Sequence, residues 1–287
     1  MRLLSKNNNI LILSILFTLC LTFNLNAQQI RMPAPSPLAE VKQTVGLTDI
    51  SIVYSRPSMK ERKIFGDLVP YGKLWRTGAN MATKITFSED VKIEGKELKA
   101  GSYAFFTIPG ESEWTFIFNT VADQPGASRY DESKDALRVT VPSQSMGTSV
   151  ETLIVGINSI RSDHAYLMVA WENTLVAAKI DVNTDEAVMA DIERAMDPAS
   201  EAGKYWAAAN YYYETDRELD KALEWINKSI ELGNNRFWVI HVKAKIQQKL
   251  GDCKAAIATA EESKKLAQEA NNDDYVALND KLIASCQ

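Results

Sequence analysis

The spacing of apolar residues in this chain changes once, close to residue 183. Before that point apolar and polar residues alternate in short runs, such as Ile50, Ile52 and Tyr54, which is the period of a half-buried β-strand. After Asp185 the apolar residues recur every three or four positions, as on one face of an α-helix. The sequence therefore predicts an α+β multidomain chain, with a β-rich domain over residues 28–183 and a helical part over residues 184–287.

The first part contains several further alternating runs, at 103–107, 114–118, 153–157 and 166–170. The run Glu94-Gly95-Lys96 predicts a hairpin, because Gly supplies the positive φ of a tight turn. Roughly nine short strands with few long helical patterns are typical of a β-sandwich-like domain. Several strands are apolar on both faces, so we expect one sheet to be covered on its outer side as well.

The second part repeats with a period of 34 residues, the length of a tetratricopeptide unit. Small and apolar residues recur at matching positions of two units, Ala222, Ile226 and Ser229 in the first and Ala256, Ala260 and Ser263 in the second. Residues 185–196 are expected to form the second helix of a degenerate leading unit, and Asp273–Ser285 a closing helix. About three units are needed for independent stability, so we expect this short tetratricopeptide-like array to be stabilised by packing against the β-domain.

The amino terminus has the layout of a secretory signal peptide. Arg2 and Lys6 precede an apolar run, Ile10–Phe23, and a small residue, Ala27, ends the segment. The run is too short for a transmembrane helix, which needs about 20 residues. We expect cleavage after Ala27, export to the periplasm or the extracellular space, and no membrane span afterwards. The alternative is a lipoprotein signal at Cys20, which is disfavoured because Leu19 occupies a position that requires a small residue.

The charge balance argues against one class of partner. Residues 184–287 carry 13 basic and 19 acidic side chains. Nucleic-acid binding requires a basic surface, so no nucleic acid is expected as a partner.

Two cysteines remain after the expected cleavage, Cys253 and Cys286. Adjacent helices of the array run antiparallel, which would bring the two residues close together. A disulfide in an exported chain and a pair of unpaired thiols are both left open.

The motifs of the common enzyme classes are absent from the sequence. It contains no nucleophile elbow, phosphate-binding Gly loop, paired-His zinc helix or Cys pair at metal spacing. Its two histidines, His164 and His241, are expected to be packed or solvated side chains. We predict no catalytic residue, no metal ligand and no cofactor.

One segment, residues 56–80, is dense in arginines and aromatic residues and is stiffened by Pro and Gly. Guanidinium groups pair with carboxylate or phosphate, and aromatic rings stack, so this composition suits an anionic or sugar-like ligand. The ligand-site candidates are Arg56, Arg62, Asp67, Tyr71, Trp75, Arg76 and Asn80. The alternative is a structural strap in which the arginines pair with local acids and Trp75 plugs the edge of the sandwich.

Several motifs in residues 36–183 resemble a bacterial family filed as domain of unknown function 2911. They are Val45-Gly46-Leu47-Thr48-Asp49-Ile50, Tyr54-Ser55-Arg56-Pro57, Ile64-Phe65-Gly66-Asp67-Leu68, Trp75-Arg76-Thr77-Gly78-Ala79-Asn80 and Asp135-Ala136-Leu137-Arg138. The resemblance implies an exported β-rich module, often followed by a helical tail, and it implies no catalytic residue. One departure is Glu61, where the family pattern leads us to expect Gly before Arg62.

The helical array offers a second candidate surface, because the first helices of tetratricopeptide pairs line a concave face. The residues expected there are Lys204, Tyr211, Trp238, His241 and Lys245, which would suit an extended peptide. The alternative is that this face docks on the β-domain and covers the sheet that is apolar on both sides.

The leading functional hypothesis is a non-enzymatic binding or scaffold protein of the cell envelope. Its partner would be a peptide, another protein or a glycan. The alternative is an envelope hydrolase or carbohydrate-active enzyme whose site lies in the Arg56–Asn80 loop, with Asp67 as the acid.

Overall fold

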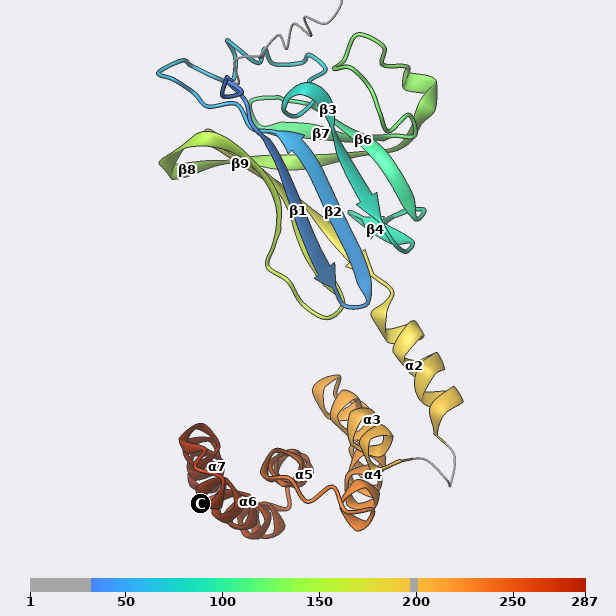
Figure 1. Ribbon diagram of the computed structural model, residues 1–287, viewed down its shortest axis with the longest axis vertical. Helices are drawn as coiled ribbons and strands as arrows, with labels where there is room; N and C mark the ends of the chain where they lie inside the picture. Colours follow the sequence, from blue (N-terminus) through green and yellow to red (C-terminus); the bar gives the residue numbers. More distant parts are fainter. Residues whose placement is uncertain (1–31, 197–200) are drawn as a thin grey trace, which may run out of the picture.

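A computed structural model of the chain describes residues 32–196 and 201–287. In these residues an antiparallel β-sheet domain comes first and six α-helices follow it (Figure 1). The predicted signal peptide, residues 1–27, lies outside the described part. The strands are β1 (Leu38–Val45), β2 (Thr48–Ser55), β3 (Ala79–Phe87), β4 (Val91–Ile93), β5 (Lys96–Leu98), β6 (Gly101–Ile108), β7 (Glu113–Asn119), β8 (Asp135–Asn158) and β9 (His164–Val182).

The nine strands are hydrogen-bonded in the order β1-β2-β3-β6-β7-β8-β9-β4-β5. The long strand β8 links two halves of the sheet, because its first residues pair with β7 and its later residues pair with β9. One hydrophobic core takes side chains from both halves, including Ile52 of β2, Phe116 of β7 and Val169 of β9. The two halves therefore face a common core.

The alternating runs of the sequence form strands where they were predicted. In β2 the side chains of Ile50, Ile52 and Tyr54 are buried in the core, whereas Ser51 and Val53 are half-exposed. The hairpin between β4 and β5 is also confirmed. Its turn residues Glu94 and Gly95 have φ values of 48° and 75°, which is the left-handed conformation that a two-residue hairpin turn requires.

The outer face of the sheet carries a second, smaller cluster of buried residues around Phe106 of β6 and Ile117 of β7. Ala127 and Tyr130, from the segment between β7 and β8, pack on this cluster together with Leu74. The expectation of a covered outer face is therefore confirmed. The expectation that the helical array covers it is wrong for these residues, because a connecting segment of the β-domain does so.

The carboxylate of Asp135 holds this covering segment in place. It accepts hydrogen bonds from the Tyr130 hydroxyl and Arg138 Nε, each at 2.6 Å, and from Asn119 Nδ2 at 2.8 Å. Burial, followed by the hydrogen bond to Asp135, raises the pKa of Tyr130 to about 12. The Asp135–Arg138 motif therefore has a structural role at the start of β8.

The helices are arranged as two pairs with a leading and a closing helix. Ala222 and Ala256, 34 residues apart, are both fully buried. Ser229 Oγ donates to Ala202 O at 2.7 Å, and Ser263 Oγ donates to Phe237 O at 2.8 Å, so each repeat ties its second helix to the start of its first. The helices are α2 (Thr184–Ala195), α3 (Ala202–Glu214), α4 (Leu219–Glu231), α5 (Phe237–Lys249), α6 (Cys253–Glu269) and α7 (Asp273–Ser285), and α7 confirms the predicted closing helix.

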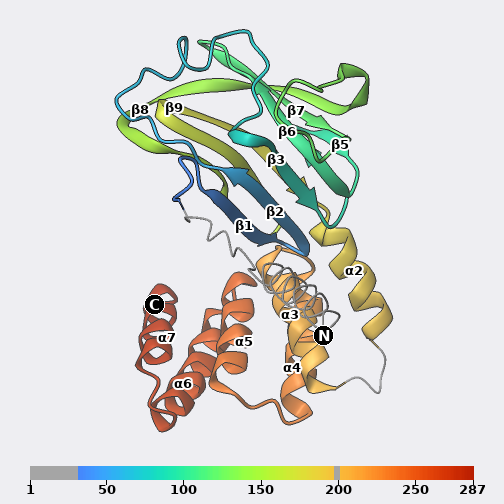
Figure 2. The same ribbon diagram turned by 45° about the horizontal axis from the view of Figure 1, so that its top comes forward.

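Helix α2 contacts both parts of the chain. Its first residue, Thr184, lies so close to Gly46 in the β1–β2 turn that a Cβ on Gly46 would be 1.7 Å from Thr184 Oγ1. The next residue, Asp185, accepts hydrogen bonds from the Tyr211 hydroxyl at 2.8 Å and from Arg217. Figures 1 and 2 show α3–α7 beyond the end of the sheet at which the β1–β2 turn lies.

None of the helices in residues 32–196 and 201–287 combines the length and the apolar composition needed to cross a membrane.

Candidate functional site

The segment between β2 and β3, residues 56–78, crosses the end of the sheet opposite to the helices (Figures 1 and 2). Backbone hydrogen bonds attach it to strands β3, β6 and β8. Trp75 exchanges a pair of them with Thr107 of β6, at 2.8 and 2.9 Å, and Met59 N donates to Glu151 O of β8 at 2.8 Å. The segment is therefore held firmly against the domain along its length.

Trp75 closes this end of the hydrophobic core. Its ring stacks on Trp171 of β9 with 5.9 Å between the ring centroids and an interplanar angle of 15°. Phe65 and Trp114 meet it edge-on, at 6.1 and 6.2 Å. The structural role foreseen for Trp75 is therefore present, and the outer side of the ring remains partly exposed.

The three arginines of the segment bond backbone carbonyl groups. Arg56 Nε donates to Leu153 O at 2.9 Å, and Arg76 Nη1 donates to Asn80 O at 3.0 Å. Arg62 donates Nε to Met59 O at 2.8 Å and Nη2 to Ser58 O at 2.7 Å. The expectation that they pair with local acids is wrong, since none of them forms an ion pair within the described part of the chain.

A cavity of about 370 Å³ lies beneath this segment. Arg62 and Arg76 line it, as does Lys60, and no acidic side chain is among the described residues of its wall. Trp75 and Trp171 contribute aromatic surface. The remaining lining residues are Pro35, Ser36, Pro57, Ser58, Leu68, Val69, Gly78 and Ala79.

The cationic side chains of this cavity share its described wall with no acidic side chain, and the Glu151 carboxylate accepts a hydrogen bond from the backbone N of Lys60 at 3.0 Å. Lys60, Arg62 and Arg76 make no ion pair with the described residues. A guanidinium group carries about five N–H donors, of which Arg62 uses two and Arg76 one, so donors remain for a ligand. The carbonyl bonds fix the orientation of both guanidinium groups, which favours binding of a planar anion.

Four of the seven ligand-site candidates do not line the cavity. Arg56 bonds Leu153 O, and Asn80 is exposed, with its Nδ2 donating to Ser55 Oγ at 3.1 Å. Tyr71 packs beside Gly66, and Asp67 is exposed. The structure therefore brings together three of the predicted residues, Arg62, Trp75 and Arg76.

Lys60 and Trp171 are cavity residues that the sequence analysis missed. Lys60 belongs to the same segment, but its direction depends on the turn at Lys60 and Glu61, where φ is 49° and 64°. Trp171 lies far away in the sequence, and only the pairing of β8 with β9 brings it to this end of the sheet. An aromatic residue in the middle of a long alternating run was the available signal for Trp171.

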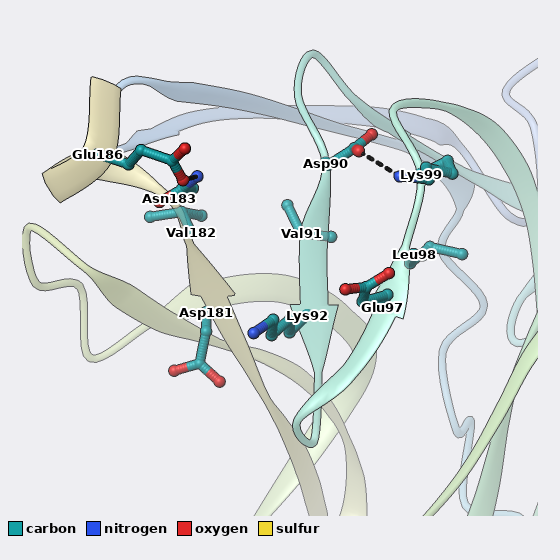
Figure 3. Close-up of a pocket in the computed structure, with 10 residues that line it drawn as sticks. All are labelled: Asp90, Val91, Lys92, Glu97, Leu98, Lys99, Asp181, Val182, Asn183 and Glu186. Carbon is teal, nitrogen blue, oxygen red and sulfur yellow. Dashed lines mark hydrogen bonds and ion pairs between the residues drawn. The ribbon is translucent and has the colours of Figure 1, made fainter. Parts of the chain in front are cut away.

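A second cavity, of about 380 Å³, lies between the β4–β5 hairpin, the end of β9 and the start of α2 (Figure 3). One ion pair joins two charged residues of its wall, Asp90 and Lys99. Lys99 Nζ lies 2.8 Å from Asp90 Oδ2 and lowers the pKa of Asp90, and Asn183 donates to Glu186. Charged side chains of both signs line this cavity.

Four of the five residues predicted for the concave helical surface make side-chain contacts with other residues of the helical part. Tyr211 bonds Asp185, and burial followed by that bond raises its pKa to about 12. Lys245 Nζ lies 3.3 Å from Glu214 Oε1. His241 is buried with Nδ1 2.8 Å from Asn279 Oδ1, and its desolvation lowers its pKa. Trp238 packs against the hydrophobic core of the helices, with the Arg236 guanidinium 5.2 Å from the centroid of its ring. Lys204 is exposed.

Cys253 and Cys286 are brought together, with 2.6 Å between their sulfur atoms. In the part of the chain that the structure covers, no group of three or more His, Cys, Asp or Glu side chains has the arrangement of a metal site.

Comparison with known proteins gave one match. A family model described as protein of unknown function (DUF2911) matches residues 36–180. The chain belongs to this family. A search of curated proteins and a search of solved structures found no match.

The DUF2911 region contains the whole cavity wall except Pro35. Within it, Gly46 contacts α2, Trp75 closes the core and Asp135 holds the covering segment. Gly46 and Asp135 thus have structural roles, whereas several other motif residues line the cavity, namely Pro57, Leu68, Trp75, Arg76, Gly78 and Ala79.

Proposed function

We propose that this chain is an exported, non-enzymatic binding protein of the cell envelope, and that its DUF2911 domain binds an anionic ligand in the cavity beneath residues 56–78. One observation supports this most strongly. Lys60, Arg62 and Arg76 line the cavity, they form no ion pair with the described residues, and no carboxylate shares the wall with them.

The chemistry of the wall indicates the kind of ligand. A guanidinium group held at a fixed angle pairs well with a carboxylate or phosphate. The neighbouring Trp75 ring offers a flat apolar surface for a sugar or an aliphatic chain. Small-molecule sites usually measure about 300–1,000 Å³, so the cavity suits one or two residues of a longer anionic polymer. An acidic glycan fits this description best.

The alternative of a hydrolase with Asp67 as its acid receives no support from this geometry. Asp67 does not line the cavity, and no other described carboxylate does so. General acid–base catalysis needs such a group within hydrogen-bond reach of the substrate.

The architecture proposed around this site has two parts. We infer that β8 bends between two layers of a β-sandwich, which is consistent with the common core of the two halves. The helices α3–α7 are proposed to form a tetratricopeptide-like array, which is consistent with the equivalent bonds of Ser229 and Ser263. Export rests on the pattern of residues 1–27 alone.

The binding proposal is tested by titration calorimetry of the mature chain with two oligosaccharides. One is an oligouronate with a carboxylate on each ring, and the other is a neutral oligosaccharide of the same length and linkage. We expect binding of the oligouronate only. The double variant Arg62→Ala plus Arg76→Ala should weaken it roughly 100-fold, because each lost bond to a charged group is worth about 1.5 kcal/mol or more.

The matched control is Arg129→Ala, which removes an exposed arginine of the same domain outside the cavity wall and should leave affinity unchanged. Equal binding of the neutral oligosaccharide, or an equal loss in the control, would contradict the proposed site. Release of a shortened product during the titration would contradict the non-enzymatic part of the proposal.

A further inference from the structure

Strand β1 forms one edge of the sheet (Figure 2). It pairs over its full length, Leu38–Val45, with β2 alone. The other edge strand, β5, has three residues, so β1 is the longer exposed edge of the described chain. Unpaired edge strands present rows of backbone donors and acceptors that can pair with another strand.

The pairing with β2 determines which backbone groups of β1 face outward. Pro37 O accepts a hydrogen bond from Arg56 N at 2.9 Å, so the odd-numbered residues of β1 bond β2. The N–H and C=O groups of Leu38, Glu40, Lys42 and Thr44 therefore point away from the sheet. Among described residues their one partner is Gln43 Nε2, which donates to Thr44 O.

The side chains of the same four residues lie on the exposed face of the strand. Glu40 and Lys42 carry opposite charges, and their side chains are 51% and 75% exposed. Edge strands usually carry charge to prevent pairing. Here the negative charge of Glu40 and the positive charge of Lys42 are placed symmetrically on either side of Val41.

This symmetry selects one register for a second copy of the strand. In an antiparallel pair centred on Val41, Glu40 of each strand faces Lys42 of the other, and Leu38 faces Thr44. The outward backbone groups of all four residues then form hydrogen-bonded pairs. Shifting the centre to Glu40 or Lys42 places two like charges opposite each other, which is destabilising.

We propose that β1 is the self-association surface of this protein, at which two chains join their sheets through antiparallel pairing of β1 centred on Val41. The partner is a second copy of this chain because the strand is complementary to itself about a two-fold axis. The surface is separate from the cationic cavity, whose wall includes no residue of β1.

The test is sedimentation velocity of the mature full chain over a range of concentrations, with charge variants on the exposed face. We expect a monomer–dimer equilibrium in the unaltered chain. Lys42→Glu and Glu40→Lys should each weaken self-association at least about tenfold, because each places two like-charge pairs across the axis. The double variant Glu40→Lys plus Lys42→Glu restores both attractive pairs and should dimerise as the unaltered chain does.

A mixing experiment separates this register from any other. The chain with Lys42→Glu and the chain with Glu40→Lys should remain monomeric alone and form a heterodimer when mixed, since every cross-strand pair then has opposite signs. A further variant, Lys42→Pro, removes one outward N–H without removing a bond to β2 and should also weaken the dimer. Circular dichroism checks that each variant is folded.

Several results would overturn the proposal. They are a monomer at every concentration, a dimer that the single variants do not weaken, and failure of the two single variants to associate with each other. Binding of a foreign extended peptide to β1 in place of self-association would also overturn it.

Discussion

Glu61 holds a left-handed backbone conformation beside the cavity, with φ of 64°. Such a conformation costs a residue with a side chain about 1–2 kcal/mol, whereas Gly adopts it freely. Gly was the residue expected at this position from the resemblance, and the positive φ is a physical reason for that expectation. The turn keeps its shape in this chain because the bonds of Arg62 to Ser58 O and Met59 O close it.

The substitution Glu61→Gly should therefore raise the free energy of unfolding by roughly 1 kcal/mol, since it relieves the left-handed strain. Urea denaturation of the two proteins measures the difference. Gly147 is the control position, because its φ is not positive and a Cβ there would meet nothing within 4 Å. Gly147→Ala should change stability little. A destabilised Glu61→Gly protein would contradict the role given to this turn.

Tyr130 makes stability depend on alkaline pH. Its pKa of about 12 in the folded chain lies above the ordinary value of 10, so the folded chain holds the proton more tightly than the unfolded chain. This contribution is complete below pH 10 and is lost as the pH rises toward 12. In Tyr130→Phe the decline of the unfolding free energy over that interval should be shallower, as chemical denaturation at several pH values would measure. An unchanged slope would argue against the Asp135 contact.

At the scale of elements, the tightest junction is the one between the β1–β2 turn and helix α2. A Cβ on Gly46 would lie 1.7 Å from Thr184 Oγ1 and 2.4 Å from Ser162 O, and the φ of Gly46 is +56°. Both the strain and the collision oppose any side chain there. The junction thus sets where the helical part begins.

Gly46→Ala should lower the free energy of unfolding by roughly 2–5 kcal/mol, which combines left-handed strain with steric overlap. Gly95→Ala is the matched control, because its φ is +75° while nothing lies within 4 Å of its Cβ position. That control should cost only the strain, about 1–2 kcal/mol. Thermal or urea unfolding distinguishes the two, and equal losses would show that Gly46 makes no tight contact with α2.

The cysteine pair belongs to the contact between α6 and α7. Both are free thiols with 2.6 Å between their sulfur atoms, and we expect them to form a disulfide in an oxidising compartment. Reduction should lower the free energy of unfolding by roughly 2–4 kcal/mol, and Cys253→Ser plus Cys286→Ser should abolish that response to reductant. Mass spectrometry after alkylation reports the state directly. Alkylation of both thiols in unreduced protein would exclude the bond.

At the scale of the whole molecule, local sequence patterns predicted most of the strands and helices. They did not predict the contacts between segments that are distant in the sequence. The alternation around Ile52 and the 34-residue repeat depend on periodicity, which is visible in one stretch of chain. The covering of Phe106 by Tyr130 depends on the path of a connecting segment. His241 was placed on a free face because its contact, Asn279, lies in another helix.

In the candidate site, too, local sequence patterns indicated some residues, and contacts between distant segments determined the others. Composition drew attention to Arg62, Trp75 and Arg76, which share the cavity wall. Trp171 joins them only through the fold, and it forms the aromatic stack with Trp75. Asp67 was a candidate acid by composition, and the turn that holds it leaves it outside the cavity.

The segment of residues 56–78, which supplies much of the cavity wall, and the helical part lie at opposite ends of the sheet (Figures 1 and 2). A ligand bound beside Arg62 would therefore leave the helices free for other contacts. The hydrophobic core of the β-domain extends from one end of the sheet to the other. Trp75 packs on it at the cavity end, and Val182 belongs to it near α2. The DUF2911 domain thus carries the proposed binding site without a contribution from the helices.

The most direct measurement is a crystal structure of the mature chain in complex with an oligouronate. We predict a carboxylate within hydrogen-bond distance of the Arg62 and Arg76 guanidinium groups, with a sugar ring beside Trp75. A ligand bound in the second cavity or on the helices, with the wall around Arg62 and Arg76 left empty, would contradict the central claim.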